Sequence, residues 1–487
     1  MSPAEVVSLA LYYVTLGILT MYSVPRVYLV RLRKRVGRAS ARPGQAEACP
    51  TFPPITIQLP LFNEPNVAAR LIDAVARLEY PGAMDIQVLD DSTDETSDIV
   101  ARKIAELGAQ TGVSVPHIAH IRRASREGYK AGALAHGMRL SNAELFAVFD
   151  ADFVPSPDVL LRVVPHFADP RIGMVQARWG HLNREHSMLT RVQAIFLDAH
   201  FAVESAARNF GGRFFNFNGT AGVWRRAAID DAGGWSSSTL TEDLDLSYRA
   251  QLAGWQFAFL SDVEVPAELP SELSGFQDQQ HRWAKGSIQT ARKLLGTIAR
   301  SDANRATKTE AFFHLTNNSA YLLSLLLALL IVPSIVIRQT AGITWTFAID
   351  FVLFAASTGS VLFFYVEGQR WAGRPRPRVR ELLAVLPVGV GMAARNATAV
   401  LEGLFERGGH FRRTPKRGNG ARDLRERKPR IPVAELILVA FFAAAVVAFV
   451  IARQWVSLPF LILFVSGYAY VSLLALRERM SYGRASQ

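Results

Sequence analysis

The chain has 487 residues, half of them apolar, and a formal net charge of +12 at pH 7. Its single cysteine, Cys49, excludes an intramolecular disulfide and a cysteine-rich metal site. The charge alone would suit a nucleic-acid partner, but arginines gather beside apolar runs, which is typical of the cytosolic flank of a membrane protein. We therefore expect a lipid bilayer, and no nucleic acid, as a partner.

Five apolar runs are long enough to cross a bilayer: residues 6–30, 315–337, 345–366, 433–451 and 456–476. The first could be a cleaved signal peptide, but Glu5 replaces the usual basic residues and no small-residue cleavage site follows. Residues 382–405 contain Pro387, Arg395 and Glu402, so we expect an interfacial helix there and not a sixth span. This topology places the N-terminus outside and the C-terminus inside, as in a multi-pass protein of a bacterial inner membrane or an equivalent membrane.

The predicted organisation has six parts. Residues 1–38 form a transmembrane helix with a basic flank, residues 39–274 a cytosolic α/β domain, and residues 275–310 an amphipathic interfacial segment. Residues 311–370 hold two transmembrane helices, residues 371–432 an interfacial helix and a cytosolic loop, and residues 433–487 the last two spans and a tail.

Within the α/β domain, short β-rich runs alternate with helical patterns, which predicts a mostly parallel sheet covered by helices. The expected strands are residues 55–59, 86–89, 117–121, 145–149 and 173–176, and the expected helices are 67–78, 96–107, 130–139 and 157–167. Ligands of such sheets bind at the carboxyl ends of the strands. Acids follow two of these strands, which suggests a cation and an anionic ligand at this edge.

Asp150 and Asp152 follow the fourth strand, where two carboxylates can share one Mg²⁺ or Mn²⁺ ion with phosphate oxygens. An ordinary surface turn is the alternative for this triplet. Asp90 and Asp91 follow the second strand, and a nucleotide's ribose and base are the expected partners of Asp90. Thr93 or Asp94 would cap the next helix. Lys130 is a candidate phosphate contact, with a solvated lysine as the alternative.

Glu242 and Asp243 open another helical pattern, residues 244–252. Thr241 could simply cap that helix. An acid in this position could instead be the general base that deprotonates an acceptor hydroxyl. The residues alone do not distinguish Glu242 from Asp243 in this role.

Gln279, Arg282 and Trp283 lie in an amphipathic stretch, residues 275–298, that precedes a span. Trp283 could be an interfacial anchor. The combination fits better with Arg282 pairing bidentately with phosphate and Trp283 forming an apolar floor for a sugar ring.

Four motifs, which contain Asp90, Asp150, Asp243 and Trp283, resemble in this order those of the processive family-2 glycosyltransferases. That family includes cellulose, hyaluronan and mannan synthases. The resemblance runs from about residue 55 to residue 416. Residues 88–94, 217–225 and 279–283 look like the motifs of the cellulose-synthase-like mannan and glucomannan synthases. The resemblance implies a GT-A fold, an inverting single-displacement mechanism and a β-linked product.

The resemblance also assigns roles to individual residues. Asp243 would be the base, with Glu242 beside it, and Asp150 and Asp152 would serve the metal. The donor would contact Glu64, Asp90, Asp91, Lys130, Asp150, Gln279, Arg282, Thr414 and Lys416, and the acceptor Trp283, Asn218, Gly219 and Thr220. Thr414 and Lys416 belong to residues 411–416, which are similar to the family's gating loop but carry Arg413 in place of a valine.

The expected reaction transfers sugar from GDP-mannose or UDP-glucose to a growing β-mannan, glucomannan or glucan, with Mg²⁺ or Mn²⁺ as cofactor. Whether the product passes through the chain's own spans stays open, as do the donor and the oligomeric state. A non-processive enzyme that glycosylates a membrane lipid is the alternative. A membrane-anchored sugar-binding protein without activity would not need a base, a metal pair and a nucleotide acid together.

Overall fold

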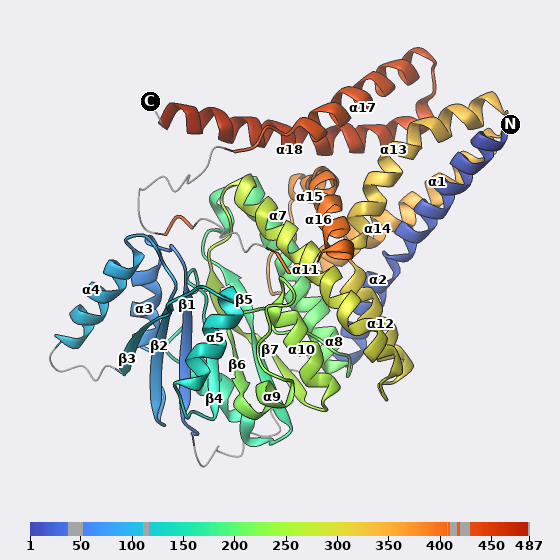
Figure 1. Cartoon of the computed structure of the whole chain (residues 1–487). Helices are drawn as coiled ribbons and strands as arrows, with labels where there is room; N and C mark the ends of the chain where they lie inside the picture. Colours follow the sequence, from blue (N-terminus) through green and yellow to red (C-terminus); the bar gives the residue numbers. More distant parts are fainter. Residues whose placement is uncertain (38–51, 111–115, 407, 410–415, 419–428, 486–487) are drawn as a thin grey trace.

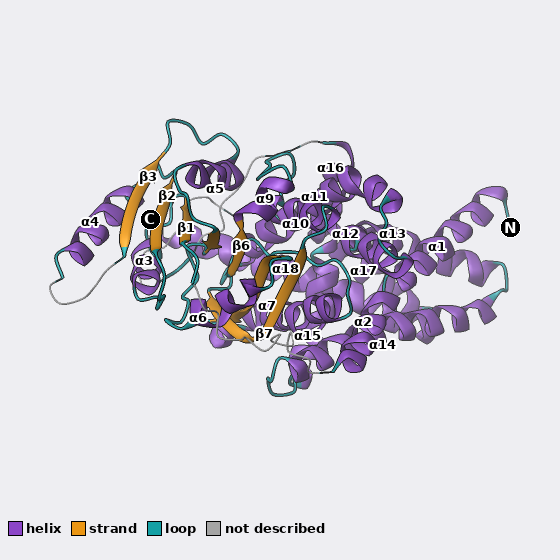
Figure 2. Ribbon diagram, turned by 90° about the horizontal axis from the view of Figure 1, so that it is seen from below, coloured by secondary structure: helices purple, strands orange, loops and turns teal. Residues whose placement is uncertain are grey.

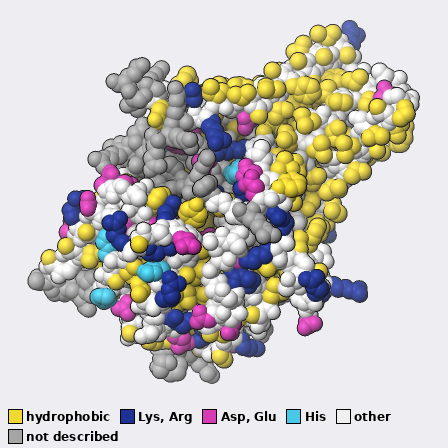
Figure 3. Space-filling view, in the orientation of Figure 1, with side chains coloured by type: hydrophobic (Ala, Val, Ile, Leu, Met, Phe, Trp, Pro, Cys, Tyr) yellow, Lys and Arg dark blue, Asp and Glu magenta, His cyan; other side chains and the backbone are white. Residues whose placement is uncertain are grey.

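The computed structural model describes residues 1–37, 52–110, 116–406, 408–409, 416–418 and 429–485. An α/β domain occupies one end of the molecule, and long helices extend from it toward the N-terminus (Figure 1). On the face shown in Figure 3, hydrophobic side chains cover the long helices, whereas charged side chains are spread over the α/β domain. This division agrees with a membrane part and a water-exposed part.

The described part of the α/β domain forms a sheet of seven strands in the order β3-β2-β1-β4-β6-β5-β7. Their bounds are β1 Ile55–Leu61, β2 Met84–Asp90, β3 His117–Arg122, β4 Leu145–Val148, β5 Ile172–His181, β6 Gly222–Arg225 and β7 Gln256–Ala267. All neighbours are parallel except β6, which runs antiparallel to both β4 and β5. The expected mostly parallel sheet is confirmed, but two strands, β6 and β7, were missed.

Helices cover both faces of this sheet (Figure 2). On one face, α3 (Ala68–Ala76) and α4 (Thr96–Gly108) pack on a core that includes Ile57 and Val88. On the other face, α5 (Tyr129–Arg139) packs on a core that includes Phe146 and Trp224. The alternation of side chains along each strand produces these two cores. The other helices of the domain are α6 Val159–Val163, η1 Val164–Ala168, η2 Arg184–His186, α7 Met188–Ala199, η3 His200–Ser205, α8 Ala206–Phe210, α9 Arg226–Asp231 and α10 Glu242–Leu252.

Among the residues that the structure describes, five helical segments are long and apolar enough to span a membrane, as the sequence predicts: Pro3–Val36, Ser319–Thr340, Thr344–Trp371, Val433–Ile451 and Trp455–Tyr482. The first is two helices, α1 (Pro3–Met21) and α2 (Val24–Val36), and not the single helix expected. The others contain α13 (Ser319–Thr340), η4 (Thr344–Thr346), α14 (Phe347–Trp371), α17 (Val433–Ile451), η5 (Trp455–Ser457) and α18 (Leu458–Ala485). The protein is therefore a multi-pass membrane protein.

The predicted interfacial helix is a pair, α15 (Val379–Gly391) and α16 (Ala393–Phe405), bent by 46°. The pair would be a sixth span if it crossed the membrane as one unit. Beside it lies α11 (Leu273–Arg300), followed by α12 (Arg305–Thr316). Since α11 also contacts α10 and α18, it joins the α/β domain to the membrane helices.

Candidate active site

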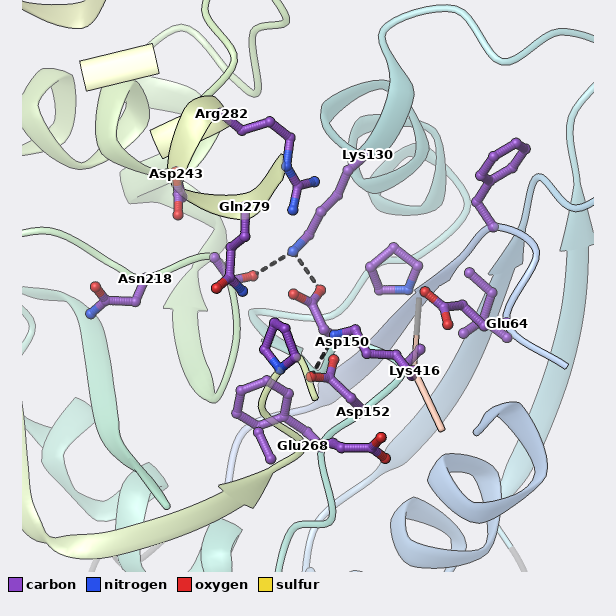
Figure 4. Close-up of a pocket in the computed structure, with 18 of the residues that line it drawn as sticks. Glu64, Lys130, Asp150, Asp152, Asn218, Asp243, Glu268, Gln279, Arg282 and Lys416 are labelled. Atoms are coloured by element: carbon purple, nitrogen blue, oxygen red, sulfur yellow. Dashed lines mark hydrogen bonds and ion pairs between the residues drawn. The ribbon is translucent and has the colours of Figure 1, made fainter. Parts of the chain in front are cut away.

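A cavity of about 180 Å³ lies at the carboxyl edge of the sheet (Figure 4). Its walls come from the ends of β1, β2 and β4, from the start of α10 and from α11. Most of the candidate residues line it: Glu64, Asp91, Lys130, Asp150, Asp152, Asn218, Gly219, Glu242, Asp243, Gln279, Arg282, Trp283 and Lys416. Residues that are far apart in the sequence thus meet where a parallel sheet is expected to bind its ligand.

Asp150 and Asp152 each face the ammonium group of a lysine. Lys130 Nζ lies 2.5 Å from Asp150 Oδ1, and Lys416 Nζ lies 2.6 Å from Asp152 Oδ2 (Figure 4). Positive charge is therefore already held at both carboxylates, which are the oxygen ligands that Mg²⁺ and Mn²⁺ prefer. No group of three or more His, Cys, Asp or Glu side chains in the described part of the chain could hold a metal. These two carboxylates alone do not make a complete metal site, and a divalent ion at this position stays a prediction.

Arg282 and Lys130 point into the same space beside Asp150 (Figure 4). Burial lowers the pKa of Arg282, while the nearby carboxylates of Glu242 and Asp278 oppose this effect. Although burial also disfavours charge on Lys130, Asp150 and Glu242 raise the pKa of its ammonium above the usual value. Two cations therefore face one cavity wall, as binding of a diphosphate requires.

Asp90 and Asp91 have different surroundings. The Asp90 carboxylate is buried, accepts hydrogen bonds from the Ser92 N–H (2.9 Å) and the Ser97 hydroxyl (2.6 Å), and lies 2.9 Å from His120 Nε2. Although burial opposes it, these contacts hold the pKa of Asp90 well below its usual range. Asp91, which accepts a hydrogen bond from Arg123 Nε at 2.9 Å, lines the cavity, whereas Asp90 is not among its described lining residues. A nucleoside contact by Asp90 stays a prediction.

The expected cap of α4 is displaced by one residue. Glu95 occupies the N-cap position and makes no capping hydrogen bond through its side chain. Asp94, the residue before the N-cap, accepts the N–H of Thr96 through Oδ1 at 3.0 Å instead. It thus satisfies a backbone donor in the first turn of the helix.

Glu242 and Asp243 begin α10 at the cavity wall. Burial, followed by the charge of Glu242, raises the pKa of Asp243 to about 7. Burial also raises the pKa of Glu242. A carboxylate whose pKa lies near neutral pH suits general-base catalysis. Thr241 occupies the N-cap position but makes no side-chain capping bond, and its hydroxyl lies 3.3 Å from Thr290 Oγ1.

The segment before β6 passes directly under Asp243. Gly219 has a left-handed backbone (φ +82°), and a Cβ atom at this position would lie 3.0 Å from Asp243 Oδ2. Its carbonyl accepts a hydrogen bond from Lys130 Nζ at 2.9 Å. Thr220 is fully buried, and its hydroxyl accepts the N–H of Asp150 at 2.9 Å. Thr220 thus positions Asp150, and it is absent from the described lining of the cavity, so its acceptor contact stays a prediction.

A second cavity, of about 490 Å³, extends from the same site between the membrane helices. Residues that line both cavities include Asn218, Thr241, Asp243, Gln279 and Trp283. The second cavity continues along residues of α1, α13, α14 and α18. Trp283 therefore lines two cavities. A residue that only anchored the chain at the membrane interface would not need this position.

Sequence analysis missed Glu268, which lies directly after β7 and lines the first cavity. Its carboxylate accepts the N–H groups of Arg417 (2.6 Å) and Gly418 (3.0 Å) and so anchors the segment that carries Lys416. Glu268 was missed because β7 was not predicted, and without that strand nothing places Glu268 at the sheet edge. Of the predicted gating loop, Lys416 is described, whereas Thr414 lies outside the described residues.

Comparison with known proteins agrees with this geometry. Residues 53–286 match the family model described as "Glycosyltransferase like family 2". Glucomannan 4-beta-mannosyltransferase 1 of Oryza sativa subsp. japonica is 45% identical over 257 residues, which are 51% of this chain and 48% of the relative. Glucomannan 4-beta-mannosyltransferase 2 of Arabidopsis thaliana is 43% identical over 262 residues, or 53% and 48% of the two chains. The chain thus spans about half the length of the curated relatives it matches.

Among solved structures, the mannosyltransferase PcManGT from Pyrobaculum calidifontis, in complex with GDP-Man and Mn²⁺, has a similar fold. Its TM-score is 0.55 at 19% identity, and the match covers 82% of this chain and 99% of that one. This likeness confirms the GT-A fold. Residues 53–286 are therefore similar to glycosyltransferase family 2 in sequence, and the rest of the chain lies outside this match.

Proposed function

We propose that the protein is an inverting hexosyltransferase that transfers mannose from GDP-mannose to the non-reducing end of a β-linked mannan or glucomannan. The observation that carries this proposal is the position of Asp243, which lies where a cavity rich in cations meets a cavity that leads to the membrane helices. The names of the relatives support mannose and a β-linkage. UDP-glucose is the second candidate donor, because glucomannan contains both sugars.

The residues of the first cavity have distinct roles in this mechanism. Lys130 and Arg282 hold the diphosphate, while Asp243 accepts the proton of the acceptor hydroxyl as its oxygen attacks the anomeric carbon from the opposite face. Asp150 and Asp152 would hold Mg²⁺ or Mn²⁺, which supplies Lewis-acid stabilisation of the leaving diphosphate. Negative charge grows on the diphosphate during transfer, so the lysine and the arginine stabilise the transition state more than the ground state.

Trp283 and Asn218 would receive the acceptor, because both face the second cavity. A product held there would extend between α1, α13, α14 and α18, which supports passage of the polymer through the spans. The same apolar surroundings would also admit a lipid acceptor, which is the second candidate function. In either case the α/β domain lies in the cytosol, where nucleotide sugars are made, and the N-terminus lies outside.

The test is incubation of the purified protein in lipid with each radiolabelled nucleotide sugar and Mg²⁺ or Mn²⁺. The product is then sized and digested with linkage-specific hydrolases. We expect a high-mass product from GDP-mannose that β-mannanase degrades. A lipid-soluble product carrying one or two sugars would instead establish the second candidate, and the absence of any sugar transfer would contradict both.

A further inference from the structure

His200 and Glu204 form a polar pair in the wall of the second cavity, and the motifs do not include either of them. Both lie in η3 (His200–Ser205), which is a π-helical turn between α7 and α8. Such turns are rare, and they occur frequently at functional sites because they redirect side chains within a helix. His200 Nδ1 lies 3.0 Å from Glu204 Oε2.

This pair is connected to the catalytic base through two consecutive residues. His200 Nε2 lies 3.0 Å from Asn218 Oδ1, and the Asn218 N–H donates to Gln176 Oε1 at 2.9 Å. The next residue is Gly219, at which a Cβ atom would lie 3.0 Å from Asp243 Oδ2. Asn218 and Gly219 therefore connect the two groups of residues: Gly219 lies next to Asp243, and Asn218 contacts His200, which is paired with Glu204.

The pair adjoins a more deeply buried ionic contact between Arg208 and Glu310, and Arg208 NH1 also lies 3.5 Å from Glu204 Oε2. The side chains of Arg208 and Glu310, 3.0 Å apart, are only 5% and 4% exposed. Those of His200 and Glu204 are 26% and 19% exposed, and both residues line the cavity. Both ring nitrogens of His200 already have partners, Glu204 Oε2 and Asn218 Oδ1, so the pair acts on the cavity through the Asn218 side chain that it holds.

The cavity around the pair has the composition of a carbohydrate site. Asn216 and Arg26 add further hydrogen-bonding groups to its wall, and the partly exposed aromatic rings of Trp283 and Tyr365 also line it. Aromatic faces and planar polar side chains together suit a sugar ring, which has an apolar face and a rim of hydroxyl groups.

We propose that His200 and Glu204 hold the Asn218 side chain in an acceptor subsite, so that its amide group binds a hydroxyl of the terminal sugar and the attacking hydroxyl is aligned with Asp243. The inference rests on the proposed function and names two positioning residues for it. Glu204 orients the imidazole, and His200 fixes the Asn218 side chain at the point where acceptor and donor meet. Loss of this alignment leaves the donor bound but lets water compete with the acceptor for the anomeric carbon.

The test compares His200→Phe, which keeps the ring volume but removes both ring nitrogens, with wild type. Donor affinity, acceptor KM, and the ratio of donor hydrolysis to sugar transfer are measured with GDP-mannose and a manno-oligosaccharide. We expect unchanged donor affinity, an acceptor KM raised about tenfold, which corresponds to one lost hydrogen bond, and a higher hydrolysis ratio. His200→Gln should restore part of the acceptor affinity, and Glu204→Gln should have a smaller effect than His200→Phe.

His314→Phe is the matched control. Its ring also lines the second cavity, but Nδ1 lies 2.7 Å from the Tyr248 hydroxyl and so makes a contact unrelated to Asn218. This variant should leave the hydrolysis ratio unchanged. An unaltered acceptor KM in His200→Phe, or a parallel loss of donor affinity and thermal stability, would overturn the subsite. Failure of the wild type to transfer any sugar would overturn the proposed function instead.

Discussion

At the scale of single residues, the site depends on charges that burial brings close together. Asp243 shares its cavity with Glu242, Lys130 and Arg282. Burial and the charge of Glu242 raise the pKa of Asp243 to about 7, so the carboxylate is half protonated near neutral pH. A base of this strength accepts a proton more readily than an ordinary aspartate and is still largely ionised under mildly basic conditions.

This pKa predicts how the reaction depends on pH. The ionised carboxylate is the active form, so activity is present above the pKa of about 7 and is lost as the pH falls through it. Below that value, kcat/KM, which reports the pKa values of the free enzyme, should fall about tenfold for each pH unit. A profile of kcat/KM for the acceptor checks this result. A flat profile between about pH 5 and pH 7 would show that Asp243 does not titrate in the reaction.

Gly219→Ala tests how closely the backbone approaches the base. The variant places a methyl group 3.0 Å from Asp243 Oδ2 and a side chain on a backbone with φ +82°. We expect loss of most transfer activity and a free energy of unfolding lowered by roughly 1 kcal/mol.

Gly212→Ala is the control, because Gly212 also has a positive φ (+65°) but no atom within 4 Å of the added Cβ. It should show the loss of stability without the loss of activity. Equal activities of the two alanine variants would contradict the proposed approach of Gly219 to the base.

At the scale of elements, the regular patterns were predictable and the interruptions were not. Strands β1 to β5 follow from β-rich runs between helical patterns. β7 has a polar stretch, Ser261 to Glu264, in its middle, and β6 has only four residues within a glycine-rich motif. Both owe their stability to neighbouring strands, so local sequence does not reveal them.

The same limit applied to the candidate site. The structure places Asp150, which follows a predicted strand, and Asp243, which opens a predicted helix, in the wall of one cavity, and their roles stay predictions. Glu268 and His200 were missed because one follows β7 and the other begins a π-helical turn. Asp90 and Thr220 have hydrogen-bond partners within the fold, which only the tertiary structure reveals.

The ammonium group of Lys416 should compete with a metal ion for the carboxylate of Asp152. Lys416 Nζ lies 2.6 Å from Asp152 Oδ2. Its ammonium group therefore occupies the position that a divalent cation would take at this carboxylate, and it neutralises the same negative charge. Lys416→Met should therefore bind Mn²⁺ several-fold more tightly in the absence of nucleotide, because like charges repel. Electron paramagnetic resonance of free Mn²⁺ measures this affinity.

Arg417→Met is the control, because Arg417 NH1 lies 3.2 Å from His186 Nε2 and so has a different side-chain contact. It should leave the Mn²⁺ affinity near that of wild type. Weaker Mn²⁺ binding by Lys416→Met would show that Lys416 helps to hold the ion and does not compete with it.

The start of α11 receives its cap from the far end of the chain. Glu478 of α18 accepts the N–H groups of Leu273 and Ser274, the latter at 3.1 Å. Because α11 also carries Arg282, Glu478→Ala should lower the free energy of unfolding by about 1 kcal/mol and weaken donor binding. Denaturation in detergent and donor titration measure the two effects. Ser481→Ala, on the same helix, should change neither, and wild-type stability of Glu478→Ala would contradict the capping role.

At the scale of the whole molecule, the membrane helices and the α/β domain build one continuous site. α11 carries residues of the first cavity and contacts both α10 and α18, while the second cavity extends from Asp243 to residues of α1 and α14. In the proposed reaction, bond formation would take place at the boundary between the two parts. On this account, the membrane helices receive the acceptor or the growing product in addition to anchoring the domain.

The most direct test of this account is Asp243→Asn, because it removes the base and keeps the size of the side chain. Donor binding is measured by titration with GDP-mannose, and transfer is measured by incorporation of radiolabelled mannose into polymer. We predict donor affinity within a few-fold of wild type and transfer slower by roughly 10²–10⁴-fold. Near-normal transfer by Asp243→Asn would contradict the central claim that this carboxylate is the base at the meeting point of the two cavities.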